Sequence, residues 1–128
     1  MTSTALLSAR GLSRGYADAA GGHAVLRGLD LELAAGEIVA VIGRSGSGKT
    51  TLLNLVGAMD RPDGGRLEFR GEDMGAWDDA ARTAFRRRAL GFVFQAFNLL
   101  PTLTVAENVG LALGRNGLPL APRVAELL

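Results

Sequence analysis

The sequence predicts an α/β fold in which a parallel core sheet is accompanied by an antiparallel flap built from the N-terminal strands. Residues 38–43 and 91–95 are nearly continuous apolar segments, which is typical of parallel strands covered on both faces. Residues 29–33 and 66–70 instead alternate apolar and charged side chains, as antiparallel strands with one buried face do. Helical spacing begins directly after the first apolar segment.

Three helices are expected along the chain. After Lys49, apolar residues recur at helical spacing until Asp60-Arg61-Pro62, which predicts a helix of about three turns. Residues 77–89 form a second predicted helix, with acidic residues at its start and three arginines at its end, an arrangement that suits the helix dipole. Residues 104–113, preceded by Pro101, form a third.

Composition narrows the classes of function. The chain has 128 residues, enough for one small domain or part of one, and no cysteine, which excludes disulfides and thiolate metal sites. A net charge of +1 with scattered arginines favours no nucleic-acid partner. We expect no secretory signal and no membrane-spanning segment, because the longest apolar runs are far shorter than the roughly 20 residues that a span needs.

The chemistry concentrates in Gly43-Arg44-Ser45-Gly46-Ser47-Gly48-Lys49-Thr50, which matches the phosphate-binding loop (P-loop) pattern. Chance would produce that pattern in about 4 of 1,000 chains of this length. Here it also stands between an apolar strand and a periodic helix, the setting that the motif requires. The motif therefore predicts a binding site for a nucleoside triphosphate with magnesium.

Each residue type in the loop has a chemical reason. Glycines allow backbone conformations in which successive amides point at phosphate oxygens, and the following helix adds its unpaired N-terminal amides. Lys49, the only lysine among fourteen basic residues, supplies a compact positive charge, and the Thr50 hydroxyl is a magnesium ligand. The predicted phosphate site comprises Gly43, Arg44, Ser45, Gly46, Ser47, Gly48, Lys49, Thr50 and Thr51.

The sequence resembles the nucleotide-binding subunits of ABC transporters, whose Walker A motif is the P-loop. The resemblance runs from the N-terminal strand through residues 57–62 and on to residues 92–101, Phe-Val-Phe-Gln-Ala-Phe-Asn-Leu-Leu-Pro. Residues 92–101 look most like the branch that serves lipoprotein release and macrolide-type export. We therefore interpret residues 1–128 as the first part of an ABC-type nucleotide-binding domain, through its Q-loop.

The resemblance implies further sites and partners. Tyr16 matches the aromatic residue that stacks on adenine, and Gln95 matches the Q-loop glutamine near magnesium and the attacking water. A partly buried tyrosine and an exposed polar residue at a strand end are the structural alternatives for these two positions. The family also implies ATP and Mg²⁺ as ligands, a transmembrane permease and a second nucleotide-binding subunit as partners, and a location at the cytoplasmic face of the membrane.

Other parts of the family pattern are not found in the chain. It contains no Leu-Ser-Gly-Gly-Gln signature and no apolar run ending in the Asp-Glu pair of a Walker B motif, and His23 precedes the P-loop, so it is not the switch histidine. Because hydrolysis needs those groups, we expect this chain alone to bind ATP with little or no turnover.

The P-loop has three rival interpretations. A GTPase needs an Asn-Lys-x-Asp element, which a chain with a single lysine at position 49 does not contain. A small-molecule kinase usually opens with its P-loop strand, whereas here about forty residues precede it. A non-catalytic P-loop interaction protein remains an alternative. Unpartnered strand edges and apolar helix faces would favour association of such a chain.

Overall fold

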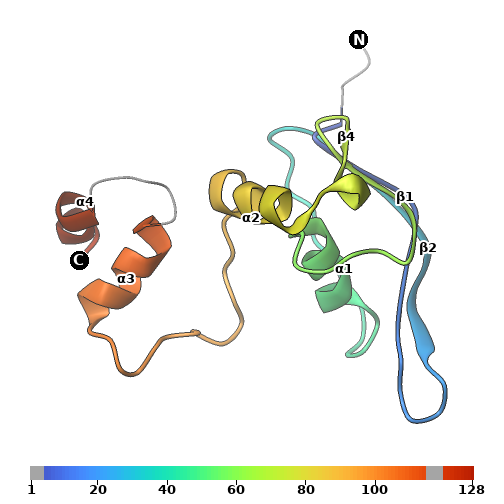
Figure 1. The fold of residues 1–128 in the computed structure, drawn as a ribbon, viewed down its shortest axis with the longest axis horizontal. Coiled ribbons are helices and arrows are strands. Elements are labelled where there is room, and N and C mark those ends of the chain that lie inside the picture. Colours follow the sequence, from blue (N-terminus) through green and yellow to red (C-terminus); the bar gives the residue numbers. More distant parts are fainter. Residues whose placement is uncertain (1–4, 115–119) are drawn as a thin grey trace. The chain divides into compact units, whose positions relative to one another are not determined.

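The computed structural model describes residues 5–114 and 120–128, and the chain divides into two compact units. The first unit ends at Thr83 and the second begins at Ala84. The fold contains both helices and strands with an antiparallel sheet near the N-terminus, which confirms the α/β class and the antiparallel flap (Figure 1).

The first unit is built on a four-stranded antiparallel sheet in the order β2-β1-β3-β4. Strand β1 lies between its two long neighbours, so both of its edges are paired. The four strands are β1 (Leu7–Tyr16), β2 (His23–Leu33), β3 (Gly64–Phe69) and β4 (Glu72–Asp73).

The alternation of apolar and charged side chains explains the register of this sheet. Leu7 of β1 lies opposite Leu33 of β2 and Phe69 of β3, and Ala9 lies opposite Leu31 and Leu67, so apolar side chains meet on one face. Asp30 and Glu32, which alternate with the leucines of β2, are exposed, as the sequence predicts. The buried hydrophobic residues of this unit are Leu7, Ala9, Leu12, Leu26, Leu52, Leu55, Ala58, Leu67 and Met74.

Helix α1 (Lys49–Val56) follows the P-loop and contacts β2. Its buried face comprises Thr51, Leu52 and Leu55, whereas Leu53 is 57% exposed, so the buried stripe differs from the one expected. The helix is shorter than predicted because Gly57 caps it and Ala58 takes a φ of 52°, which turns the chain out of the helix. A short 3₁₀ helix, η1 (Met74–Ala76), contacts β3.

The two predicted parallel strands are not formed. Residues 37–44 lie outside the four strands of the sheet, and Ile38 and Ile42 are 97% and 90% exposed. Residues 91–95 likewise contain no strand, and Val93 is fully exposed. The physical reason is the absence of neighbours: within residues 5–114 and 120–128, no strand pairs with either segment, and a parallel strand is stable only between partners.

Helices α2 (Asp79–Arg88), α3 (Val105–Gly114) and α4 (Leu120–Leu127) complete the structure. The first two match the predicted helices, and α2 has Asp79 in its first turn and three arginines in its last. Helix α4, which the sequence analysis did not predict, contacts α3, and a Cβ at Gly110 would lie 4.0 Å from Val124 Cγ2. In the described residues, no helix is long and apolar enough to cross a membrane.

The start of α3 carries a capping box. The Thr104 amide and hydroxyl donate hydrogen bonds to Glu107 Oε2 at 2.7 and 2.9 Å, and the Glu107 amide donates back to the Thr104 hydroxyl at 3.3 Å. These bonds satisfy donors that the helix itself leaves unpaired. The hydrogen bonds from Thr104, first from its amide and then from its hydroxyl, hold the pKa of Glu107 below its usual value.

Candidate nucleotide-binding site

The P-loop forms a tight turn that delivers the chain into α1. Gly46 and Gly48 have φ angles of 78° and 97°, a region that glycine enters without strain. The Ser47 amide donates to the Arg44 carbonyl at 3.1 Å, which closes the turn. Gly46 and Gly48 therefore take the backbone conformations expected of the loop glycines, whereas Gly43 does not have a positive φ.

Gly48 also brings the loop against the sheet. A Cβ at this position would lie 2.9 Å from Leu26 Cδ2 and 3.0 Å from Val25 Cγ1 of β2. A Cβ there would force these side chains to shift, and the φ of 97° also favours glycine, so glycine lets the start of α1 approach β2 without strain. Gly48 consequently fixes where the helix begins relative to the sheet.

The N-terminus of α1 is open to an anion. Gly48 is the N-cap, and no side chain caps the helix, although the Leu52 amide donates to the Gly48 carbonyl at 2.9 Å. The first amides of a helix lack partners within the helix and carry the positive end of its dipole. Thr50 in the first turn is exposed, and Thr51 is buried at 9% exposure. This end of α1 therefore presents unpaired donors and a hydroxyl beside the loop.

Lys49 lies folded over the P-loop. Its Nζ donates to the carbonyl oxygens of Gly43 and Arg44, both at 2.7 Å, and lies 3.4 Å from Ser47 Oγ. The chain's only lysine thus places its charge beside the carbonyl oxygens of the loop. A phosphate group bound here would meet a charge that is already held in place.

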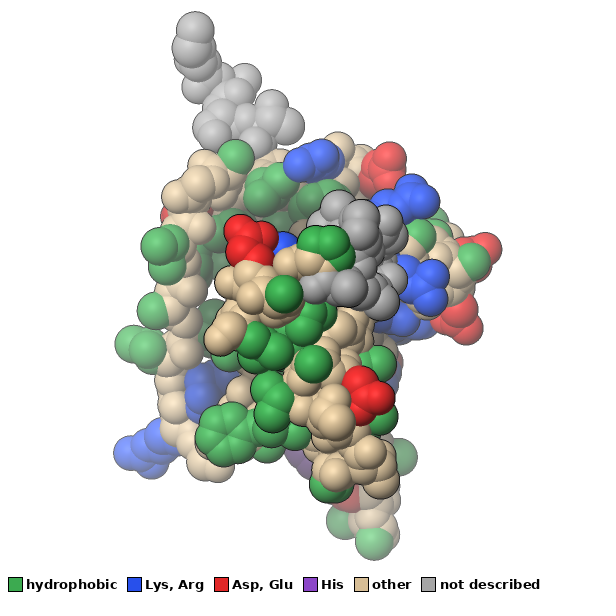
Figure 2. Space-filling model, turned by 90° about the vertical axis from the view of Figure 1, so that its left-hand side faces the viewer, with side chains coloured by type: hydrophobic (Ala, Val, Ile, Leu, Met, Phe, Trp, Pro, Cys, Tyr) green, Lys and Arg blue, Asp and Glu red, His purple; other side chains and the backbone are tan. Residues whose placement is uncertain are grey.

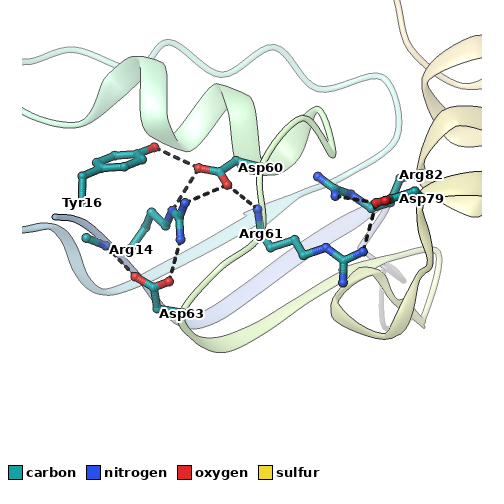
Figure 3. A network of polar contacts seen from close by, with 8 residues as sticks. Arg14, Tyr16, Asp60, Arg61, Asp63, Asp79 and Arg82 are labelled. Carbon is teal, nitrogen blue, oxygen red and sulfur yellow. Dashed lines mark hydrogen bonds and ion pairs between the residues drawn. The ribbon is translucent and has the colours of Figure 1, made fainter.

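Tyr16, at the end of β1, is 38% exposed and lines an open cleft of about 390 Å³. Its hydroxyl donates to Asp60 Oδ2 at 3.0 Å, and the guanidinium carbon of Arg14 lies 4.8 Å from the centre of its ring (Figure 3). Tyr16 therefore combines an exposed ring with a bonded hydroxyl, so the structural alternative and the stacking role are compatible.

Arg14 and two aspartates form a charged cluster beside Tyr16. Arg14 binds Asp60 through Nε and Nη2, both at 2.9 Å, and binds Asp63 through Nη1 at 2.6 Å. Asp63 also accepts from the Gly15 amide at 2.7 Å. Partial burial works against the charge on Asp60, but hydrogen bonds from the Arg61 amide, Tyr16 and Arg14 outweigh it and lower the pKa of Asp60.

The same contacts shift the pKa values of the other two members. The Gly15 amide, and then Arg14, lower the pKa of Asp63. For Arg14, partial burial acts to lower the pKa, but hydrogen bonds to Asp63 and Tyr16 and the charges of both aspartates raise it. The cluster is therefore a fully ionised clamp at neutral pH, joining β1 to residues 60–63.

Gln95 lies in the second unit, exposed in a bend after Phe94, and its magnesium role stays a prediction. His23 lies at the start of β2, where its Nδ1 is 3.0 Å from Asp18 Oδ2, as suits an exposed hairpin residue. In the described residues, no group of three or more His, Asp or Glu side chains could hold a metal ion.

Comparison with known proteins decides the family. The family model described as ABC transporter matches residues 26–127, about four fifths of the chain. The chain belongs to the ABC transporter family. This ABC family chain is 46% identical to the lipoprotein-releasing system ATP-binding protein LolD of Pseudomonas syringae pv. tomato. The match covers the full length of this chain and 57% of that protein.

Two further similarities agree. The chain is 42% identical to the macrolide export ATP-binding/permease protein MacB of Azoarcus sp., over 95% of this chain and 19% of that protein. A solved dimeric structure of the ATP-binding cassette MJ0796, bound to ADP and phosphate, matches with a TM-score of 0.84 and 34% identity, covering 93% of this chain and 53% of that one. The ABC family chain thus spans about half the length of the LolD and cassette relatives.

Sequence reasoning missed the cluster around Tyr16. The sequence places Asp60 in a helix stop and in the stretch that resembles the family, and it predicts no role for Arg14 or Asp63. The available signal was the occurrence of charged residues next to the chain's only tyrosine and directly after the P-loop helix. Pairing them requires the register of β1 with β3, because these residues are more than forty positions apart.

Proposed function

We propose that this chain binds ATP with magnesium as the nucleotide-binding part of an ABC transporter. The observation that carries the proposal is the P-loop itself, a glycine turn leading into a helix whose N-terminus no side chain caps, with Lys49 held over it. This arrangement suits a polyphosphate, since amides, a helix dipole and a fixed ammonium all favour negative charge. Membership of the ABC transporter family supports the same ligand.

Each predicted residue has a distinct role in this site. The amides of residues 43–51 surround the phosphates, and Lys49 contacts their outer oxygens. Tyr16 stacks on the adenine, and Thr50 acts as a magnesium ligand, while the magnesium role of Gln95 rests on the family resemblance alone. Bound magnesium would neutralise phosphate charge, and the residues of this chain would orient the nucleotide around it.

The partners follow from the relatives. LolD is named as the ATP-binding protein of a lipoprotein-releasing system, and MacB as an export ATP-binding/permease protein. We infer that this chain works with a transmembrane permease, in the same branch, at the cytoplasmic face of a membrane. The similar cassette was solved as a dimer, which supports a second nucleotide-binding subunit as the other partner.

The P-loop alone supplies only part of a hydrolytic site. It binds and orients phosphates, but cleavage also needs an oriented water and balanced transition-state charge. We therefore expect the 128-residue chain by itself to release little phosphate from ATP. Steady phosphate release that disappears in Lys49→Ala would contradict this expectation.

Isothermal titration with MgATP tests the proposed function. Lys49→Ala removes one charge-assisted contact, worth about 1.5–3 kcal/mol, so ATP affinity should fall roughly tenfold to a hundredfold. Arg27→Ala, an exposed basic residue of β2 outside the loop, is the matched control and should bind like the parent chain. Equal binding by Lys49→Ala and the parent would overturn the proposal.

A further inference from the structure

Tyr16 is restrained on two sides by charged residues. Its hydroxyl is tied to Asp60 Oδ2 at 3.0 Å, and Arg14 lies over one face of its ring at 4.8 Å from the centroid (Figure 3). The side chain is nevertheless 38% exposed at the cleft that it lines. The ring therefore has a set orientation and retains surface that a flat ligand could cover.

Asp60 holds this arrangement together. Its carboxylate accepts from Tyr16, from Nε and Nη2 of Arg14, and from the Arg61 amide at 2.8 Å. The bidentate contact with Arg14 fixes both the carboxylate and the guanidinium. Both partners are only about a quarter exposed at their side chains, so water competes weakly for these bonds.

The position of Asp60 in the chain gives these bonds a further meaning. Asp60 follows the C-terminal end of α1, the helix whose first residues are Lys49 and Thr50, and its amide donates to the Asn54 carbonyl of that helix at 3.2 Å. Tyr16 ends strand β1. One carboxylate thus joins the aromatic ring of the cleft to the helix that begins at the P-loop.

We propose that Asp60, together with Arg14, is a positioning residue that holds the Tyr16 ring ready for a nucleobase while the P-loop binds the phosphates. The proposal rests on the proposed function and deepens it by naming what orients the base-binding ring. A ring fixed before binding loses less rotamer entropy when a base stacks on it. Asp60 therefore contributes to affinity for a nucleotide and nothing to affinity for phosphates alone.

This distinction defines the experiment. Affinities for MgATP and for inorganic triphosphate with magnesium are measured by calorimetry on the 128-residue chain, and their ratio is the readout. Asp60→Ala should lower the affinity for MgATP about three- to tenfold, which is the effect of one lost hydrogen bond. It should change the affinity for triphosphate by less than about twofold. Asp79→Ala, which loses similar contacts to Arg61 and Arg82 but touches neither Tyr16 nor Arg14, is the matched control and should leave the ratio unchanged.

A second variant covers the case in which Asp60→Ala does not fold. Tyr16→Phe keeps the ring and the Arg14–Asp60 pair but removes the hydroxyl. It should therefore lower the ratio of ATP affinity to triphosphate affinity, as Asp60→Ala does. In the double variant Asp60→Ala/Tyr16→Phe, the two effects should not add, because both remove the same bond.

The outcomes are separable. Equal losses of ATP and triphosphate affinity, additive effects in the double variant, or an unchanged ratio in Tyr16→Phe would overturn the positioning role. If the parent chain binds ATP no more tightly than triphosphate, Tyr16 does not engage a base. The inference then fails, while phosphate binding stands. If the parent binds neither ligand, the proposed function fails, and the inference fails with it.

Discussion

Gly48 shows how one residue can serve both the backbone and the packing of the P-loop. Its φ of 97° is strained for any residue with a Cβ, and its hydrogen atoms face Leu26 and Val25 at distances that admit no methyl group. Gly46 has a similar φ of 78°, but a Cβ there would meet nothing within 4 Å. Comparing substitutions at these two glycines therefore distinguishes backbone strain, present at both, from steric contact, present only at Gly48.

Substituting these glycines by alanine tests that separation. Gly48→Ala combines strain with overpacking and should cost about 2–5 kcal/mol, whereas Gly46→Ala should cost about 1–2 kcal/mol from strain alone. Urea unfolding followed by the fluorescence of Trp77, the only tryptophan, reports on the unit that contains both sites. Equal destabilisation by the two variants would contradict the steric role of Gly48.

Among the elements, β1 and residues 60–63 are joined by charge as well as by strand pairing. Asp60 and Asp63 both have a lowered pKa in the folded state, for the reasons given above. A carboxylate with a lowered folded-state pKa stabilises the fold above its ordinary pKa of about 4, and this stability is lost as the pH falls through the folded pKa. The clamp should therefore weaken in acid.

An acid titration checks the clamp. The parent chain and Asp60→Asn/Asp63→Asn are compared by Trp77 fluorescence melting between pH 7 and pH 2. The double variant should melt lower at pH 7 but lose less of its melting temperature below about pH 4, because asparagine does not titrate. If the two chains lost the same amount in acid, the stabilising charge of the clamp would be excluded.

Helix α3 offers a second test at this scale. Thr104→Ala removes the two hydroxyl bonds of the capping box, which should cost about 0.5–2 kcal/mol and raise amide exchange in the first turn of the helix. Thr102→Ala, at an exposed turn residue two positions earlier, is the control and should change stability by less than about 0.5 kcal/mol. Unchanged exchange at Asn108 in Thr104→Ala would contradict the capping role.

Element type followed from the sequence for several elements with a clear local pattern, whereas helix α4 was not predicted. The alternation in residues 29–33 and 66–70 corresponds to β2 and β3, and the helices predicted over 77–89 and 104–113 correspond to α2 and α3. Segments 38–43 and 91–95 did not become strands, because a parallel strand depends on neighbours distant in sequence. The P-loop could be found by its spacing, whereas the Arg14, Asp60 and Asp63 cluster depends on tertiary pairing.

In the molecule as a whole, apolar side chains remain at the surface. Ile38, Ile42 and Phe97 are at least 90% exposed, and hydrophobic side chains are visible at the surface in Figure 2. Exposed apolar groups of this kind favour association with another surface. The chain also spans only about half the length of the LolD and cassette relatives.

Analytical sedimentation tests whether the exposed apolar side chains cause the chain to associate. The parent chain should show an average mass that rises with concentration, and Ile38→Glu/Ile42→Glu should reduce that rise, because charge at an exposed apolar segment opposes association. Thr102→Ala serves again as an exposed control. Identical concentration dependence of the parent and the glutamate variant would exclude residues 38–42 as an associating surface.

ATP binding at the P-loop is tested most directly by mapping backbone amide shifts of the isotope-labelled chain on addition of MgATP. The amides of residues 43–51 should shift together, along with Tyr16, and these shifts should be lost in Lys49→Ala. Shifts confined to other residues, or none at saturating MgATP, would contradict the account.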